Sequence, residues 1–454
     1  MRSQPVIAIF DVGKTNKKLF LFDQQYNIVY ERSARFLETV DEDGDPCENI
    51  ESLRLSVFDS LRHVFGKKEF VVKALNFSAY GASFVHLDEE GSPVAPLYNY
   101  LKAYPQELLQ QFYNNYGGEE AFSLRCASPV LGSLNSGMQL YRLKYEKPEL
   151  FQKIKYSLHL PQYLSYLISG KACSDITSIG CHTNLWDFIE NGYHEWVRRE
   201  SVDSKLAPLC AYNEVCKASF PGTNYLVGTG LHDSSAALIP YMVNFNEPFV
   251  LLSTGTWCIS LNPFNDTPLT AEELKEDCLC YLNYQGKQVK ASRLFAGNEH
   301  EEAIKRLADF FHQDAIKYRF VEFNPETIDR LQKQGKDAKG LCFADRDLSA
   351  YASYEEAYHQ LMLDIMAQQI RSTQLVLNGS SAKRLFVDGG FSKNSIYMNL
   401  LAAAFPQMEI YAASMAQATS LGAALAVHNA WNKKAVPNTL IQLQYYSVAQ
   451  ALSV

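Results

Sequence analysis

Two similar strand–turn–strand units, about half a chain apart, constrain the fold of this sequence more than any other feature. The first runs from the apolar segment PVIAIF through a turn at 11–16 into KKLFLFD. The second is FVLLSTGTWCISLN at 249–262, with Ser253, Gly255 and Thr256 in its turn. Glycine lets a backbone approach a ligand closely, and hydroxyl and N–H groups suit phosphate oxygens. The pattern predicts two similar halves, each bringing a phosphate-binding turn to a shared cleft.

The length and composition of the chain fit two globular domains. At 454 residues the sequence is too long for one ordinary hydrophobic core, so two domains of roughly 200 residues each are expected. The segment 242–248 is polar and contains a proline, so we predict domains at 1–245 and 246–454. A hydrophobic fraction of 47% with 20% charged residues is typical of soluble globular proteins.

Charge and hydropathy argue against several classes of partner. The net charge of −8 and the lack of a dense Lys/Arg run speak against nucleic-acid binding. No run of ~18 apolar residues occurs, so we expect no membrane span. The first apolar run has about six residues, shorter than the core of a secretory signal, and we expect a cytoplasmic protein. The ten cysteines are scattered without a C-x-x-C pair, which favours reduced, buried thiols over a metal–thiolate site.

Alternating strand and helix patterns predict a mixed-sheet α/β fold in both halves. Each half opens with antiparallel strands, and helices and a further strand follow. The predicted strands are 5–10, 17–23, 27–36, 71–77, 249–262, 278–290 and 384–390. The predicted helices are 48–66, one from 136 that ends near Pro148, 299–313, 352–378, 395–405 and 418–431.

The segment 98–125 is rich in tyrosine, and two interpretations stay open. Tyr98, Tyr100 and Tyr104 could line a pocket for a hydroxylated ligand, because tyrosine combines an apolar ring with a polar hydroxyl. Equally, the segment could be a surface helix whose tyrosines form a packing face.

Asp11 lies where the first strand ends and a glycine turn begins. A carboxylate there can hold Mg²⁺ through water while the turn receives a phosphate. The alternative is a turn-stabilising role, which is common for Asp before Gly. The second, similar turn at 253–256 favours the magnesium interpretation.

A third glycine site, 388–394, follows a predicted strand and precedes a predicted helix. A strand, a glycine pair and a helix can position a nucleotide against the N-terminus of the helix. The segment matches neither G-x-G-x-x-G nor the phosphate-binding loop G-x-x-x-x-G-K-[ST], and a simple turn is the alternative.

Asp233, in the segment GTGLHDSSAA, is the candidate general base. It follows a glycine-bracketed loop and precedes small residues suited to a tightly packed helix. Capping of that helix is the alternative role. Phosphoryl transfer needs a base for the acceptor hydroxyl, a metal ion, and donors for the developing charge. His182 and His232 are more typical of packing residues, and we assign them no catalytic role.

Together these segments resemble the FGGY carbohydrate kinases, which are two-domain relatives of actin and hexokinase. The resemblance covers the opening turn, FVLLSTGTWCISL, GLHDSSAAL and DGGFSKN, and it extends to SGMQLYRLKYEKPELF and LPQYLSYLISGKACSDITSIG. STGTW, HDSSA and SAYGASFVHLD look closest to the rhamnulokinase and fuculokinase branch. The resemblance implies an α/β fold with two actin-like (ribonuclease H-like) domains and a cleft between them.

The resemblance also implies roles for individual residues. It implies an ATP site formed by Asp11, Gly13, Thr15, Asn16, Lys18, Ser253, Gly255, Thr256, Gly389, Gly390 and Asn394. It implies a sugar site at Tyr80, Ser83, Asn99 and Asp233, with Asp233 as the catalytic base and Asp11 and Asp233 as the metal carboxylates.

Four positions depart from the family pattern. Lys14 stands where the family usually has Thr, and Lys18 where it often has Arg. Ser83 stands where rhamnulokinases tend to have Asp, and 98–100 lacks the usual Asp and Arg. The last two departures concern the sugar and not the phosphoryl-transfer residues.

The resemblance therefore implies a cytoplasmic kinase that uses ATP and Mg²⁺ to phosphorylate a small sugar. A ketose of the L-rhamnulose or L-fuculose type is the leading substrate, and a ketopentose such as xylulose is the main competitor. A catalytically inactive sugar- or nucleotide-sensing protein on the same fold is the alternative from another class. The oligomeric state does not follow from the sequence, and a homodimer is one option.

Overall fold

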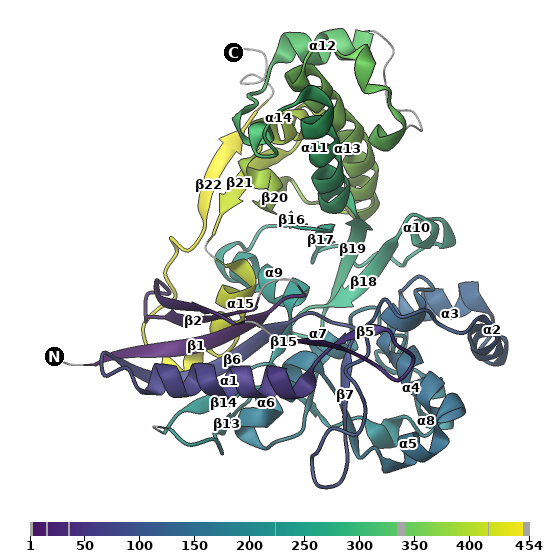
Figure 1. The fold of residues 1–454 in the computed structure, drawn as a ribbon, viewed down its shortest axis with the longest axis vertical. Coiled ribbons are helices and arrows are strands. Elements are labelled where there is room, and N and C mark those ends of the chain that lie inside the picture. The colour runs from purple at the N-terminus through teal and green to yellow at the C-terminus, as the bar shows by residue number, and fades with distance from the viewer. Residues whose placement is uncertain are drawn as a thin grey trace.

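The computed structural model describes residues 3–14, 17–34, 37–222, 224–333, 342–415 and 417–447 (Figure 1). The predicted phosphate contacts Thr15 and Asn16 lie outside the described residues.

A mixed sheet forms the core of the first half. Its order is β13 (Val215–Lys217), β14 (Leu226–Gly228), β6 (Phe70–Ala79), β1 (Gln4–Val12), β2 (Lys17–Phe22) and β3 (Ile28–Ser33), and β15 (Leu231–His232) also pairs with β6. β1 runs antiparallel to β2 and parallel to β6.

Helices cover both faces of this sheet, which explains why β1 is apolar at nearly every position. Val6, Ala8 and Phe10 pack in one core with α1 (Ile50–Phe65) and α6 (Leu160–Ser169). The alternate residues Ile7 and Ile9 pack in another with α9 (Asp233–Asn244) and α15 (Ala418–Ala426).

The second half repeats the central pattern. Its sheet has the order β18 (Cys278–Leu282), β19 (Gln288–Leu294), β17 (Cys258–Asn262), β16 (Phe249–Thr254), β20 (Arg384–Gly389), β21 (Glu409–Ser414) and β22 (Gln442–Tyr446). As in the first half, the leading strand, β16, is antiparallel to the next strand and parallel to a later one. α11 (Ala296–Phe311), α13 (Tyr354–Leu377) and α14 (Ser395–Ala404) pack in the core on one face. The predicted two-domain α/β fold is confirmed.

The remaining elements are short or lie between the sheets and the surface. They are β4 (Glu38–Val40), β5 (Pro46–Glu48), β7 (Phe84–Leu87), β8 (Tyr156–His159), β9 (Ser174–Asp175), β10 (Trp186–Asp187), β11 (Gly192–Tyr193), β12 (Leu209–Cys210), α2 (Gln106–Asn115), α3 (Glu119–Cys126), α4 (Ser136–Glu146), α5 (Pro148–Lys153), α7 (Ile176–Ile179), α8 (Glu195–Arg199), α10 (Ala271–Lys275), α12 (Pro325–Lys333) and α16 (His428–Trp431).

Some element boundaries differ from prediction for local reasons. The helix predicted to begin at 136 and to end near Pro148 is confirmed, because α4 ends at Glu146 and Pro148 begins α5, where its missing N–H does no harm. The predicted strand 278–290 is two strands joined by a turn. In the tyrosine-rich segment, Tyr104 and Tyr113 are buried in a helical core, as the packing interpretation predicts.

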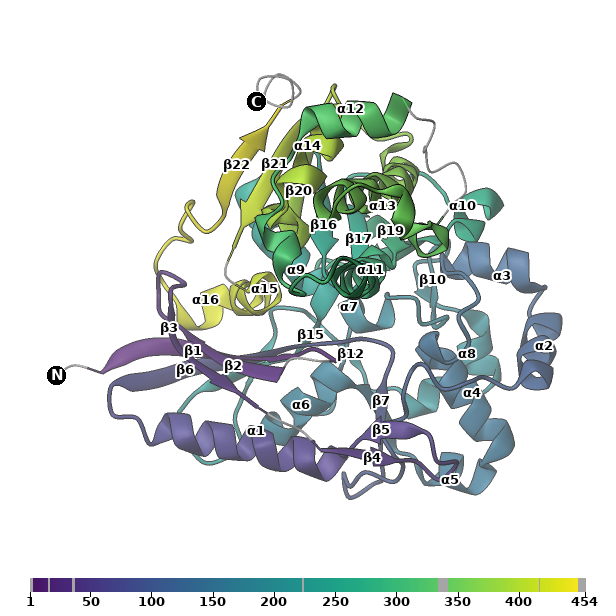
Figure 2. The same cartoon turned by 45° about the horizontal axis from the view of Figure 1, so that its top comes forward.

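The helix α15 belongs to the second half in sequence but packs on the first sheet. In Figures 1 and 2 it lies beside β1 and β2, below the sheet that contains β20 and β21. Leu421, Ala423 and Ala424 share a core with β1 and α9. The division of the chain at residue 245 stays a prediction. By its contacts, the segment 417–431 belongs with the first sheet, although in the sequence it lies in the second half.

Gly422 allows the close contact between α15 and α9. A Cβ atom at this position would lie 1.8 Å from the carbonyl oxygen of Ala236, which belongs to the backbone of α9. We expect Gly422→Ala to lower the free energy of unfolding by about 1–3 kcal/mol, as overpacking does. Urea unfolding would measure this loss. Gly192→Ala is the control, because its Cβ would meet nothing within 4 Å, and an equal effect of the two variants would contradict the prediction.

Two further findings bear on the sequence-based expectations. All ten cysteines are free thiols. Among the described residues, no helix combines the length and the apolar character needed to cross a membrane.

Candidate active site

Asp11 lies at the C-terminal end of β1, and its side chain contacts the beginning of α15. Its Oδ2 accepts hydrogen bonds from the hydroxyl groups of Thr419 and Ser420. Burial raises the pKa of Asp11, these two hydrogen bonds oppose the rise, and the negative charge of Asp233 adds to it. Sequence reasoning missed Thr419 and Ser420, although their hydroxyl groups stand at the start of a predicted helix.

The strand register brings Asp233 to the same sheet edge as Asp11. Asp11 and Leu231 pair with Ser78 from opposite sides of β6, so their backbones are about 10 Å apart. Asp233 follows two residues later and begins α9. It is the first helical residue and not the N-cap, which is His232.

The carboxylate of Asp233 is held on one side and remains partly exposed. Its Oδ1 accepts the backbone N–H of Ser234 at 2.6 Å and lies 3.3 Å from Nε2 of His232. Within the described part of the chain, no hydrogen bond reaches Oδ2. The side chain is 30% exposed, so an acceptor hydroxyl has access to it.

The two histidines near Asp233 are buried. Burial, with the nearby positive charge of Arg293, lowers the pKa of His182 to about 3. Burial also lowers the pKa of His232, although the charge of Asp233 opposes this. Both imidazoles are therefore neutral near pH 7, which fits a packing role. A Cβ at Gly81 would lie 2.7 Å from His232, so this loop packs directly on the residue before Asp233.

Two tyrosines and a lysine form a cluster at the end of β1, where the N–H of Tyr80 donates to the carbonyl of Val12. The rings of Tyr80 and Tyr100 meet edge to face, with centroids 5.9 Å apart. Nζ of Lys14 lies 5.3 and 5.6 Å from these two ring centroids and 3.8 Å from Oε1 of Glu48. Burial raises the pKa of Tyr100, and the charge of Asp233 raises it further. The negative charge of Asp233, the candidate base, therefore acts on the hydroxyl of Tyr100.

Sequence reasoning assigned Tyr80 to this region but gave no role to Lys14 or Glu48 and left that of Tyr100 open. The departure of Lys14 from the family pattern was the available signal. No local signal marked Glu48, which is buried and pairs with Lys17 at 3.1 Å.

The other two predicted sugar contacts are engaged with the backbone. Ser83 is only 1% exposed, and its hydroxyl donates to the carbonyl of Tyr98 at 3.4 Å. Asn99 donates to the carbonyl of Pro46 and accepts the N–H of Leu101. In this structure Ser83 supports the loop and has no open face.

The glycine turns of the second half converge on Thr254. Its hydroxyl donates to the carbonyl of Asp388 and accepts the N–H of Phe391, while its own carbonyl accepts the N–H of Gly390. A Cβ at Gly389, whose φ is +88°, would lie 1.9 Å from that carbonyl. The turn at 253–256 and the turn at 389–391 therefore form one rigid unit.

The predicted ligand-binding residues of this unit face outward. Gly255, Thr256, Gly389 and Gly390 are exposed, and Ser253 is half-buried. The start of α11 completes the unit, because Asn298 donates its N–H to Thr256. Asn394 is the N-cap of α14 and donates its amide to the hydroxyl of Tyr358 at 2.7 Å.

The helix α9 links the two groups of residues. It begins with Asp233, and its Tyr241 donates a hydrogen bond to Asp388 at 3.1 Å, at the end of β20. Among the described residues, no hydrogen bond or ion pair joins the predicted phosphate residues of the first half directly to those of the second. Lys18 pairs with Glu31 at 2.6 Å, and its charge acts on Asp11 from the neighbouring strand.

The donor set fits Mg²⁺ better than a metal held by protein ligands alone. The charge of Asp233 is close enough to disfavour the charged form of Asp11, and a divalent cation between them would relieve this repulsion. No group of three or more His, Cys, Asp or Glu residues suited to a metal occurs in the described ranges. Mg²⁺ commonly uses one or two carboxylates and completes its shell with water and phosphate.

These observations define a class of protein: a two-domain enzyme of the actin and ribonuclease H type. The profile of the FGGY family of carbohydrate kinases, N-terminal domain, matches residues 6–202. Two profiles of the C-terminal domain of FGGY carbohydrate kinases match 246–329 and 348–431. The chain belongs to the FGGY family of carbohydrate kinases, and it is an ATP-dependent sugar kinase.

Solved structures of similar fold agree over nearly the whole chain. A carbohydrate kinase from Novosphingobium aromaticivorans is 21% identical, with a TM-score of 0.79 over 98% of this chain and 95% of that chain. A xylulose kinase from Lactobacillus acidophilus is 16% identical, with a TM-score of 0.79 over 98% and 94%. A gluconate kinase from the same organism is 16% identical, with a TM-score of 0.77 over 99% and 95%.

Proposed function

We propose that this kinase transfers the γ-phosphoryl group of ATP to a hydroxyl group of a ketose, with Asp233 as the general base. The observation that carries the proposal is the convergence of Asp11 and Asp233 on one sheet edge, with the Tyr80–Tyr100 pair at the end of β1. Residues 1–245 would bind the sugar, and 246–454 would bind most of the nucleotide.

In this mechanism the sugar hydroxyl loses its proton before or while its oxygen attacks the γ-phosphorus of ATP. Asp233 would accept the proton of the attacking hydroxyl through the oxygen that the fold leaves free. Exposed backbone groups of the turns at 253–256 and 389–390 would receive phosphate oxygens and the nucleoside. Asp11 and Asp233 would hold Mg²⁺, which neutralises charge on the phosphate oxygens when bound. Closure of the two domains would exclude water from the reacting groups.

The proposed sugar is a 6-deoxyketohexose of the L-rhamnulose or L-fuculose type. The tyrosine pair offers an apolar edge on which a methyl group can pack, and the ammonium of Lys14 offers a donor to sugar oxygens. A ketopentose is the competitor, and the fold shared with a xylulose kinase is the reason to include it in the test.

A ketose panel tests the proposal. Purified protein is incubated with ATP, Mg²⁺ and L-rhamnulose, L-fuculose, D-xylulose or no sugar, while ADP release is followed. We expect ADP release above the sugar-free control with a 6-deoxyketohexose. Release only with xylulose would replace the proposed substrate. Sugar binding without ADP release from any sugar would favour the sensing protein.

A further inference from the structure

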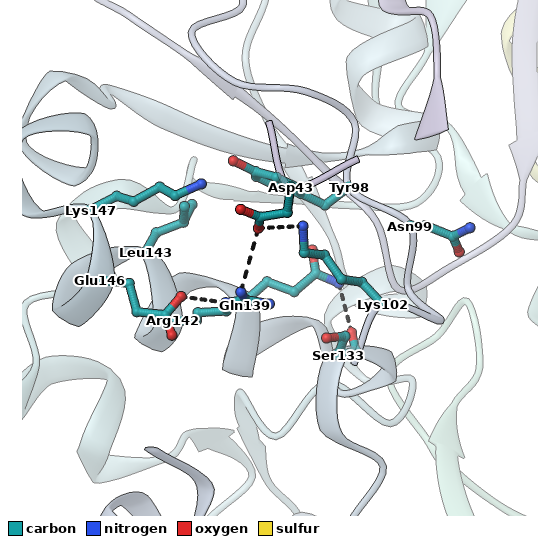
Figure 3. Close-up of a pocket in the computed structure, with 10 residues that line it drawn as sticks. All are labelled: Asp43, Tyr98, Asn99, Lys102, Ser133, Gln139, Arg142, Leu143, Glu146 and Lys147. Carbon is teal, nitrogen blue, oxygen red and sulfur yellow. Dashed lines mark hydrogen bonds and ion pairs between the residues drawn. The ribbon is translucent and has the colours of Figure 1, made fainter. Parts of the chain in front are cut away.

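An acidic turn between β4 and β5 surrounds the ammonium group of Lys102. The turn, at 41–45, has the sequence Asp-Glu-Asp-Gly-Asp. Nζ of Lys102 lies 2.5 Å from Asp41 Oδ2, 2.7 Å from Asp43 Oδ2 and 3.1 Å from Asp45 Oδ2. The side chain of Lys102 is 6% exposed, and Figure 3 shows its contact with Asp43.

The backbone of the turn is arranged around this cation. Oδ1 of Asp41 accepts the N–H groups of Asp43 and Asp45, and the N–H of Gly44 donates to the carbonyl of Asp41. The three carboxylates thus come from alternate residues of one tight loop. Here the cation in contact with all three is an ammonium group of the same chain.

Asp41 and Lys102 stabilise each other in their charged forms. Burial alone would raise the pKa of Asp41, but hydrogen bonds from Lys102 and from backbone N–H groups hold that pKa below its ordinary value. Burial alone would lower the pKa of Lys102, but its hydrogen bonds to the three carboxylates raise that pKa above its ordinary value. Both groups are therefore charged near neutral pH.

Lys102 ends a turn that presents Tyr100. The N–H of Lys102 donates to the carbonyl of Asn99 at 2.9 Å, and the N–H of Leu101 donates to the side chain of Asn99 at 3.0 Å. Tyr100 lies inside this turn, so its position depends on where Asn99 and Lys102 are held. The turn between β4 and β5 also holds Tyr98, whose hydroxyl donates to Glu42 at 2.6 Å.

We propose that Lys102 is a positioning residue for sugar binding, whose ammonium group ties the acidic turn to the turn at 99–102 and thereby holds Tyr100 against Tyr80 and Lys14. The inference rests on the proposed function, because Tyr100 acts here as part of the sugar site. Its contacts with Tyr80, at 5.9 Å between ring centroids, and with Nζ of Lys14, at 5.6 Å, connect the acidic turn with the proposed sugar site.

The neighbouring cations do not share this role. Arg142 pairs with Glu146 at 2.6 Å and is 3.7 Å from Asp43, and Lys147 pairs with Glu42. Figure 3 shows Asp43, Arg142, Glu146 and Lys147, which line a cavity of about 30 Å³, room for about one water molecule. Only Lys102 contacts all three aspartates of the turn within the described chain.

Sugar and ATP affinities of Lys102→Met test the role without requiring turnover. We expect the sugar Kd from calorimetry to rise about tenfold, because a displaced Tyr100 would lose about one hydrogen bond to the sugar, and the ATP Kd to stay unchanged. Lys102→Arg should restore much of the sugar affinity. Lys144→Met is the matched control, because Lys144 pairs with Glu200 at 2.7 Å in the same region and should leave both affinities unchanged.

Asp43→Asn provides a milder variant should Lys102→Met fail to fold. Asp43 is 45% exposed, so its loss leaves no buried charge, and we expect a smaller rise in sugar Kd. An unchanged sugar Kd in Lys102→Met, or an equal rise of the ATP Kd, would overturn the inference alone. Wild-type protein that binds no ketose would overturn the proposed function, and this inference with it.

Discussion

Asp233→Asn is expected to lower kcat by ~10² or more, which is the usual contribution of a general base. The amide has nearly the shape of the carboxylate and keeps an oxygen for the N–H of Ser234, but it cannot accept the proton of a sugar hydroxyl. The sugar and ATP KM values should change much less than kcat. Steady-state ADP release with the accepted ketose measures all three quantities.

Ser234→Ala is the matched control for this prediction. It removes a hydroxyl 3.4 Å from Asp233 Oδ1 and leaves both the carboxylate and the backbone N–H bond in place. Its kcat should stay close to that of the wild type. Near-normal turnover of Asp233→Asn would remove Asp233 from the mechanism, whereas equal losses in both variants would point to a general disturbance of α9.

Asp11→Asn is expected to abolish most turnover and at the same time to stabilise the fold. Burial and the charge of Asp233 raise the pKa of Asp11, so the folded state disfavours the charged carboxylate more than the unfolded state does. An amide keeps an oxygen for Thr419 and Ser420 without that charge. We expect kcat to fall by ~10² through loss of a metal ligand, and Tm to rise by roughly 2 °C near neutral pH.

The pH dependence supplies the control for this second prediction. A raised carboxylate pKa in the folded state costs stability as the pH rises through and above the range between the unfolded and folded values, the ordinary value being 3.8. Below that range both states bind the proton, so the Tm difference between variant and wild type should shrink on acidification. A Tm that falls in Asp11→Asn at neutral pH would show that the charge stabilises the fold in the absence of ligands.

Local patterns carried much of the fold and part of the candidate site. The apolar runs on both sides of the turn at 253–256 were sufficient to predict β16 and β17, because a strand buried on both faces is a short continuous apolar run. The segment 388–394 was recognisable as the end of a strand followed by a helix. Its glycines and Asn394 separate the apolar run of β20 from the apolar residues of α14.

Contacts between distant segments decided the rest. The hydroxyls that bind Asp11 are 408 and 409 residues away in the chain, and the helix that carries them returns to the first sheet through the close approach at Gly422. Likewise, no local pattern tells that Lys102 lies among the aspartates of 41–45. Sequence periodicity reports which face of an element is buried, whereas the identity of the partner depends on packing of the whole chain. The sequence by itself thus determined the two α/β halves and the candidate carboxylates, and the tertiary structure alone decided what surrounds them.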